Sequence, residues 1–157
     1  MNMTPVKASA SEAILTHIIR SEDLNMHGSL FGGKMLSLMD NCAAITAMRH
    51  SKRGCVTVSI SDVSFLAPVR MGNIVTLRSR LHFTARSSME LLCTAVREDH
   101  VSGDLKEVCR AYFTFVAIDS DNQSVPVPPV ELETAEDRAL NAEAKARYDA
   151  RRQAKAR

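Results

Sequence analysis

A single aspartate stands in the middle of a long apolar segment. Asp40 lies within residues 34–50, KMLSLMDNCAAITAMRH, which contain no glycine or proline and end in two basic residues, a pattern typical of a helix. Its neighbours three and four residues away on a helix cannot neutralise a carboxylate: Leu36, Ser37, Ala43 and Ala44. An ionised carboxylate in apolar surroundings is costly unless it is paired. The spacing leaves two interpretations open, a group kept for catalysis or an ion pair with Arg78 or Arg80.

A glycine-rich loop leads into this predicted helix. Gly28, Gly32 and Gly33 would leave unpaired backbone N–H groups at the positive end of the helix dipole. Such groups can stabilise a phosphate or a developing oxyanion. Asn25 and His27 of the same loop could orient a water or a carbonyl. Glycines at a helix entry and polar residues in a turn also occur for structural reasons alone, so the loop does not decide the chemistry.

The same loop contains a false match to a nucleotide-binding motif. Residues 28–34, GSLFGGK, fit the G-x-x-x-x-G-K pattern of the P-loop. The next residue is Met35, where Ser or Thr would be needed to hold magnesium. The sequence also predicts no buried parallel strand running directly into the loop. We therefore reject a P-loop.

Two further sets of residues have types that can do chemistry. Arg86, Ser87 and Ser88 stand between two predicted strands, where they can hold a phosphate or form an ordinary polar turn. The four cysteines lie in apolar stretches, without a C-x-x-C pair or a histidine at zinc-ligand spacing: Cys42, Cys55, Cys93 and Cys109. We predict no metal site and four free, buried thiols in a reducing compartment.

Apolar residues on either side of the helix predict the elements that must position these groups. A β-branched run covers residues 14–19. Four further strands are predicted at residues 56–65, 75–83, 91–96 and 109–117, with turns at 71–73 and 101–104. The predicted helix is apolar on nearly every side and must be buried. An antiparallel sheet can bury one helix only by curling around it, which predicts an α+β fold.

The two ends of the chain differ from this central region. Residues 1–12 are predicted to form a flexible N-terminal arm, and residues 13–130 the folded domain. Residues 131–157 are rich in Ala, Glu, Arg and Lys with almost no apolar stripe, which predicts a solvated C-terminal helix.

Composition narrows the possible partners and location. The 157 residues suffice for one globular domain, with 45% hydrophobic and 24% charged residues. A net charge of +2 gives no reason to expect a nucleic-acid partner. No apolar run reaches the roughly 18 residues of a membrane span. The first residues lack the apolar core of a secretory signal. We expect a cytoplasmic protein with no membrane partner.

Several of these segments together resemble one family. Residues 25–33, NMHGSLFGG, followed by residues 35–40, MLSLMD, are similar to the signature of the hotdog-fold acyl-CoA thioesterases, closest to their cytosolic acyl-CoA hydrolase branch. Residues 56–72, the turn RSSM at 86–89, and the segments 113–117 and 125–128 resemble the same family. The resemblance covers residues 14–130. It implies a hotdog fold, in which the antiparallel sheet curls around the central helix. It also implies that the enzyme hydrolyses fatty acyl-CoA to fatty acid and CoA without a cofactor. It further implies active sites at the interface of a homodimer and assembly as a trimer of dimers.

The resemblance also implies roles for single residues. Asp40 would act as general base on water, backbone N–H groups near Gly32 and Gly33 would form the oxyanion hole, and Asn25 would position water or the carbonyl. Other residues would contact the substrate or its CoA: His27, Gly28, Phe31, Thr57, Arg86, Ser87 and Ser88. Direct attack by Asp40 through an anhydride is the competing mechanism, and a non-catalytic acyl-CoA-binding module is the competing function. A dehydratase is disfavoured, because hotdog dehydratases typically use a catalytic histidine on the helix, whereas this helix has Asp40 at mid-length and His50 at its far end.

Overall fold

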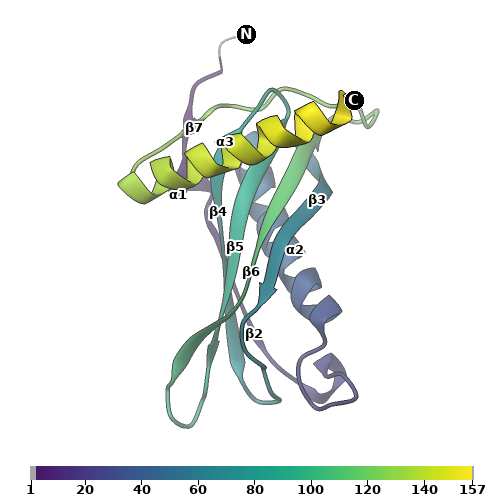
Figure 1. Ribbon diagram of the computed structural model, residues 1–157, viewed down its shortest axis with the longest axis vertical. Coiled ribbons are helices and arrows are strands. Elements are labelled where there is room, and N and C mark those ends of the chain that lie inside the picture. Colours follow the sequence, from purple (N-terminus) through teal and green to yellow (C-terminus); the bar gives the residue numbers. More distant parts are fainter. Residues whose placement is uncertain (1–2, 157) are drawn as a thin grey trace.

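A curved antiparallel sheet with one long helix on each of its faces makes up most of the molecule (Figure 1). The computed structural model describes residues 3–156. The main sheet has five strands in the order β2-β4-β5-β6-β3: Ala13–Ile18 (β2), Gly54–Phe65 (β3), Ile74–Thr84 (β4), Ser88–Glu98 (β5) and Leu105–Ile118 (β6). Helix α2, Gly32–Ser51, packs against all five strands. This arrangement confirms the predicted α+β fold built around a central helix.

The core lies between α2 and the inner face of the sheet. Alternate residues of the central strands are fully buried there, as the period of two predicts: Val75, Leu77, Leu81, Leu91, Cys93, Phe113 and Phe115. Met35, Met39, Ala43 and Ala47 of α2 meet them. The helix is not buried on every side, however. Ser37 and Asn41 are exposed and Met48 is 44% exposed, because the sheet covers only one face of α2.

The burial of each cysteine depends on the helix or strand that carries it. Cys42, Cys93 and Cys109 are free and buried, as predicted. Cys55, close to the start of β3, is only half-buried, which differs from the prediction. Of the helices in residues 3–156, none combines the length and the apolarity that a transmembrane span requires.

The N-terminal residues differ from the loose arm that we expected. Strand β1, Val6–Lys7, pairs in parallel with β7, Val130–Glu131, and helix α1, Ala8–Ser11, packs against α2 and β4. Ala8 and Ser11 are completely buried. Such small side chains allow close packing without a hydrophobic pattern. The sequence therefore did not predict that this segment packs against the domain.

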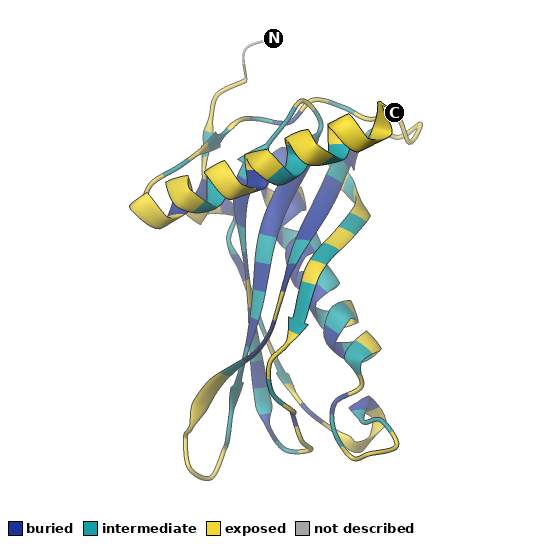
Figure 2. Ribbon diagram, viewed as in Figure 1, coloured by how far each residue is buried: buried dark blue, intermediate teal, exposed yellow. Residues whose placement is uncertain are grey.

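The C-terminal helix also differs from the solvated helix that we expected. Helix α3, Ala135–Lys155, crosses the outer face of the sheet, and its outward side is exposed (Figures 1 and 2). Its inner side is held largely by polar contacts. Arg147 and Arg151 bind the buried Glu90 of β5 at 2.7 and 2.9 Å, and the Arg147 guanidinium lies 3.8 Å from the centre of the Tyr112 ring. Ala144 of the same helix is fully buried.

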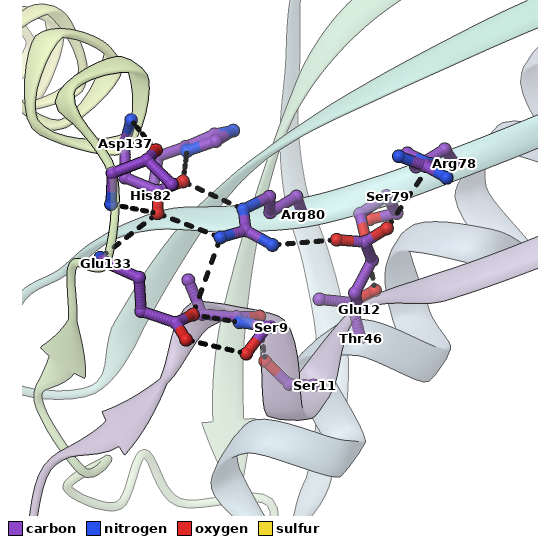
Figure 3. Close-up of polar contacts among 12 residues, drawn as sticks. Ser9, Ser11, Glu12, Thr46, Arg78, Ser79, Arg80, His82, Glu133 and Asp137 are labelled. Atoms are coloured by element: carbon purple, nitrogen blue, oxygen red, sulfur yellow. Dashed lines mark hydrogen bonds and ion pairs between the residues drawn. The ribbon is translucent and has the colours of Figure 1, made fainter.

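A second polar cluster joins both ends of the chain to the sheet (Figure 3). Arg80 of β4 donates to both oxygens of Asp137 at 2.8 Å and to Glu12 at 2.8 Å. Asp137 also accepts from the backbone N–H groups at the start of α3, where Thr134 caps the helix. The hydrogen bond from Arg80 holds the pKa of Asp137 well below its usual range, although burial opposes the shift. The cluster fixes the beginning of α3 against β4.

Candidate active site

The first turn of α2 carries unpaired backbone donors. Phe31 occupies the N-cap position and has no side-chain acceptor for the helix N–H groups. Its carbonyl accepts from Met35 N–H at 3.1 Å, the first helical bond. Within residues 3–156, no protein acceptor meets the N–H groups of Gly32, Gly33 and Lys34. This helix start can therefore bind an anion or an oxyanion, as the glycine loop predicted.

Two aromatic rings flank this helix start, and Gly33 allows one of them to approach closely. A methyl group at Gly33 would come within 2.5 Å of the Phe31 ring, and one at Gly32 within 3.4 Å of the Phe65 ring. Both rings are 57% exposed. Gly32 and Gly33 thus leave the backbone accessible while Phe31 and Phe65 flank it with apolar surface.

The loop that precedes the helix is held by Asn25. Its side-chain oxygen accepts from the N–H groups of His27 and Ser29 at 2.9 and 3.2 Å, and its amide donates to the Ser29 hydroxyl at 3.1 Å. Gly28 takes a left-handed φ of 79° in the same turn. His27 and Gly28 are exposed. In this chain Asn25 shapes the loop, and its amide faces Ser29.

Asp23 fixes this loop to the helix, and the sequence analysis missed it. Its carboxylate is 3% exposed and accepts from the Arg20 backbone N–H and from His17 at 2.9 Å, with Lys34 at 3.4 Å. Its carbonyl accepts from Phe31 N–H at 2.9 Å. Burial raises the pKa of Asp23, but these hydrogen bonds outweigh burial and lower it. In the sequence, the only indication of this role was an acidic residue two positions before Asn25.

Asp40 lies in the middle of α2 and faces β3. The Thr57 hydroxyl donates to its Oδ1 at 2.7 Å. The Asp40 side chain is half-buried, so the strongly apolar setting inferred from its helix neighbours is wrong for the isolated chain. The reason is that Thr57, 17 residues later, supplies the polar contact that the neighbouring turns lack.

The proposed ion pair of Asp40 with a sheet arginine is also absent. Arg78 pairs with Glu12 at 3.2 Å, and Arg80 pairs with Glu12 and Asp137. These arginines lie on the outer face of the sheet, whereas α2 lies on the inner face. In the described part of the chain, Asp40 forms no ion pair and keeps one free carboxylate oxygen.

The helix start and Asp40 are too far apart for one site within a single chain. Asp40 comes eight residues after Gly32, which is roughly 12 Å along a helix axis at about 1.5 Å per residue. A thioester-sized group bound by the Gly32 and Gly33 N–H groups would therefore be out of reach of the Asp40 carboxylate on the same helix.

The predicted phosphate-binding turn lies farther away still. Ser88 pairs with Val116 of β6, and so does Val56 near the start of β3. The ring of Phe65, at the opposite end of β3, faces Gly32. One chain therefore does not bring Arg86, Ser87 and Ser88 to the helix start. Arg86 is exposed, and both serines are half-buried.

An apolar cavity of about 460 Å³ opens beside the helix start. Its lining residues come from the loop before α2, from α2, from the segment after β3 and from β6: Ser29, Leu30, Gly32, Met35, Phe65, Leu66, Ala67, Pro68, Val69 and Val108. No three His, Cys, Asp or Glu side chains come together as a possible metal site among the described residues.

Known proteins resemble this chain in sequence and in fold. Residues 27–103 match the model of the thioesterase superfamily. The uncharacterized acyl-CoA thioester hydrolase YkhA of Bacillus subtilis is 37% identical over 92% of this chain and 84% of its own length. The chain belongs to the thioesterase superfamily. The human cytosolic acyl coenzyme A thioester hydrolase is 33% identical to this thioesterase over 94% of the chain, which spans 40% of the human protein.

Solved structures agree with the fold. An acyl-CoA hydrolase from Bacillus cereus superposes on this thioesterase with a TM-score of 0.90 and 40% identity, covering 96% of this chain and 92% of the other. A hexameric acyl-CoA thioesterase gives a TM-score of 0.93 with 32% identity, covering 98% and 99% of the two chains. The hotdog fold implied by the sequence motifs is thereby confirmed.

Proposed function

We propose that this thioesterase hydrolyses fatty acyl-CoA to free fatty acid and CoA. The observation that carries the proposal is the first turn of α2, whose backbone donors are unpaired and open between two aromatic rings. Such donors stabilise the oxyanion that forms when water attacks a thioester carbonyl. The names of the relatives, acyl-CoA thioester hydrolases in Bacillus subtilis and in human, support the same reaction.

In the proposed reaction, the thioester oxygen accepts hydrogen bonds from the N–H groups of Gly32 and Gly33. Asp40 removes a proton from a water molecule, and the water oxygen bonds to the carbonyl carbon to give a tetrahedral intermediate. Collapse of this intermediate breaks the carbon–sulfur bond and releases the fatty acid, and the proton held by Asp40 passes to the departing CoA thiolate, which restores the Asp40 carboxylate. The hydrogen bond from Thr57 orients Asp40 for this step, and Asn25 maintains the loop that carries the oxyanion hole.

The proposed site is shared by two chains. The separation of roughly 12 Å between Asp40 and Gly32 on one helix requires that the two groups of a working site come from different helices. Strand β3 is an edge of the sheet and exposes Val56, Val58 and Ile60, a surface suited to a second copy. An antiparallel pair of β3 strands would bring the start of one strand to the end of the other. We propose a homodimer as the minimal active unit.

Further features of the proposal follow from the dimer. The partner's turn at residues 86–88 would approach the helix start and contact the CoA phosphates, with the exposed His27, Gly28 and Phe31 along the route.

The hexameric thioesterase structures support assembly as a trimer of dimers. The reaction as written uses no metal or cofactor besides the CoA of the substrate. The human relative's cytosolic designation supports a cytoplasmic location.

The decisive experiment measures CoA release. The purified protein is incubated with acyl-CoA esters of increasing chain length, and free CoA is detected with a thiol reagent. Steady turnover is expected, whereas tight acyl-CoA binding without CoA release would contradict hydrolysis and favour a binding module. A single turnover in ¹⁸O-water then separates the two mechanisms, because label in the Asp40 carboxylate would show an anhydride.

A further inference from the structure

Asp23 connects three parts of the chain that surround the proposed oxyanion hole. Its carboxylate oxygen Oδ2 lies 2.9 Å from His17 Nε2 in β2 and accepts from the Arg20 backbone N–H at 2.9 Å. The other oxygen, Oδ1, lies 3.4 Å from the Lys34 ammonium in the first turn of α2. Burial alone would raise the pKa of Asp23, but these hydrogen bonds lower it, so the carboxylate is ionised at neutral pH and His17 Nε2 donates to it. The buried carboxylate thus holds β2, the loop and α2 together.

The proposed oxyanion hole is held on both of its sides by Asp23. The backbone carbonyl of Asp23 accepts from the N–H group of Phe31, the residue before Gly32, at 2.9 Å. Its carboxylate binds Lys34, the residue after Gly33. Glycine has no side chain that restricts its backbone, so the direction of the Gly32 and Gly33 N–H groups depends on the residues that flank them.

Asn25, the other polar residue that shapes this loop, does not make the same connection. Among the residues that the structure describes, the Asn25 side chain bonds only within the loop, to His27 and Ser29. The carboxylate of Asp23 reaches both strand β2 and helix α2. Because Asp23 is only 3% exposed, its part in the reaction is indirect.

The charges around Asp23 suit a helix start that must bind a developing negative charge. Lys34 lies at the positive end of the helix dipole, where a cation is unfavourable, and the Asp23 carboxylate offsets this cost. An unpaired carboxylate beside the helix start would in turn repel an oxyanion, and the Lys34 ammonium offsets that repulsion. The N–H groups of the first turn therefore remain available to the anion.

We infer that Asp23 is a positioning residue for acyl-CoA hydrolysis, an inference that rests on the proposed function. Through its bonds on either side of the two glycines, Asp23 aims their N–H groups at the thioester oxygen. The oxyanion forms only as the reaction proceeds, so N–H groups that lose their fixed direction slow the reaction without weakening the binding of acyl-CoA. Loss of the Asp23 carboxylate should therefore lower kcat and leave KM unchanged.

Asp23→Asn tests the carboxylate with almost no change of shape. The amide keeps one acceptor oxygen but turns its NH₂ group towards another donor, either His17 or Lys34, which weakens the connection to α2. In protein shown to be folded by urea denaturation, kcat should fall about 10- to 100-fold, less than the roughly 100- to 1,000-fold effect of deleting an oxyanion donor. Asp121→Asn, in an exposed turn, is the matched control and should keep both kinetic constants. An unchanged kcat in folded Asp23→Asn, with or without a raised KM, overturns the inference and leaves the hydrolase function intact.

Lys34 offers a second test that does not alter a fully buried residue. Lys34→Met keeps the length of the side chain and removes the ammonium, whereas Lys34→Arg keeps the charge. Lys34→Met should lower kcat about tenfold, and Lys34→Arg should retain most of it. The double variant Asp23→Asn/Lys34→Met should be no slower than the slower single variant, because both substitutions break one connection. A wild-type kcat in Lys34→Met, or losses that multiply in the double variant, would contradict the inference.

Backbone NMR separates this inference from the reaction. The chain has six glycines, so ¹⁵N-glycine labelling reports the N–H groups of Gly32 and Gly33 among few signals. Asp23→Asn and Lys34→Met should shift these two signals and leave that of Gly103, in an exposed turn, in place. If the wild type hydrolyses no acyl-CoA, the proposed function fails, and these signals alone decide whether Asp23 positions the helix start. Unmoved Gly32 and Gly33 signals show that it does not.

Discussion

Asp40 and Thr57 form a contact that links the central helix to an edge strand. The Thr57 hydroxyl occupies one carboxylate oxygen at 2.7 Å, and the second oxygen remains available for a proton. A carboxylate held in this way by one hydroxyl is oriented without being neutralised. It therefore suits a general base better than it suits a structural ion pair.

Asp40→Asn should separate catalysis from stability. Asparagine keeps the shape and can still accept from Thr57, so the free energy of unfolding should change by less than about 0.5 kcal/mol. Acyl-CoA hydrolysis should fall by about 10²–10⁴, as expected when a general base is lost. Steady-state kinetics and urea denaturation measure the two quantities. Asp121→Asn, in an exposed turn, is the control and should match the wild type. Near-normal turnover in Asp40→Asn would contradict the proposed base.

At the scale of elements, helix α3 depends on a buried carboxylate. Glu90 is 1% exposed and binds Arg147 and Arg151, so Glu90→Gln leaves two guanidinium groups without their anion. Because both arginines are partly exposed, we expect a loss of about 2 kcal/mol, less than the 3–5 kcal/mol of a fully buried pair. Thermal or urea unfolding measures it.

The same helix offers a matched control for this prediction. Glu143 lies 3.9 Å from Arg147, but its side chain is 60% exposed. Glu143→Gln should therefore change the unfolding free energy by less than about 0.5 kcal/mol. Equal effects of the two substitutions would show that α3 is not held through Glu90.

Stability should also depend on pH through His82, which is 4% exposed beneath α3. Burial, opposed by Asp137 and assisted by Arg80 and Arg147, lowers the pKa of His82 to about 4. The unfolded chain takes up this proton near pH 6.5, so stability falls as the pH drops from 6.5 to about 4. At about 1.4 kcal/mol per pKa unit, the loss approaches about 3 kcal/mol.

His82→Phe keeps a ring at this position and removes the titration. Urea denaturation at pH 7 and at pH 4.5 should show a loss of stability in the wild type that the variant reduces by about 2 kcal/mol. The pH dependence that remains in His82→Phe then reports the other titrating groups. Identical losses in the two proteins would contradict the assignment to His82.

At the scale of the whole molecule, the proposed site needs two chains. Asn25→Ala and Asp40→Asn should each be nearly inactive alone. In a mixed dimer, one site carries both substitutions and the other carries neither. Random pairing of equal amounts gives about half mixed dimers, so about a quarter of wild-type activity should return after co-refolding. Mass measurement confirms the mixed dimers, and their presence without recovered activity would leave only a site within one chain.

Much of this molecule could be predicted from local pattern. The alternation around Val75 and Phe113 predicted strands, and the apolar run around Asp40 predicted the central helix, because periodicity reports which face of an element meets the core. The glycine loop likewise predicted an open helix start, since capping depends on residues adjacent in sequence. The motifs between residues 25 and 40 then identified the family.

Only the tertiary structure decided the contacts between residues that are far apart in the chain. Thr57 reaches Asp40 from β3, and Arg147 of α3 reaches Glu90 on the opposite side of the sheet from α2. Polar and small residues make these contacts, so the sequence shows no apolar stripe that would predict them. For the same reason the sequence predicted a solvated helix at α3. A charged side chain can be an anchor or a solvated group, and which one it becomes depends on the partner that the fold brings to it.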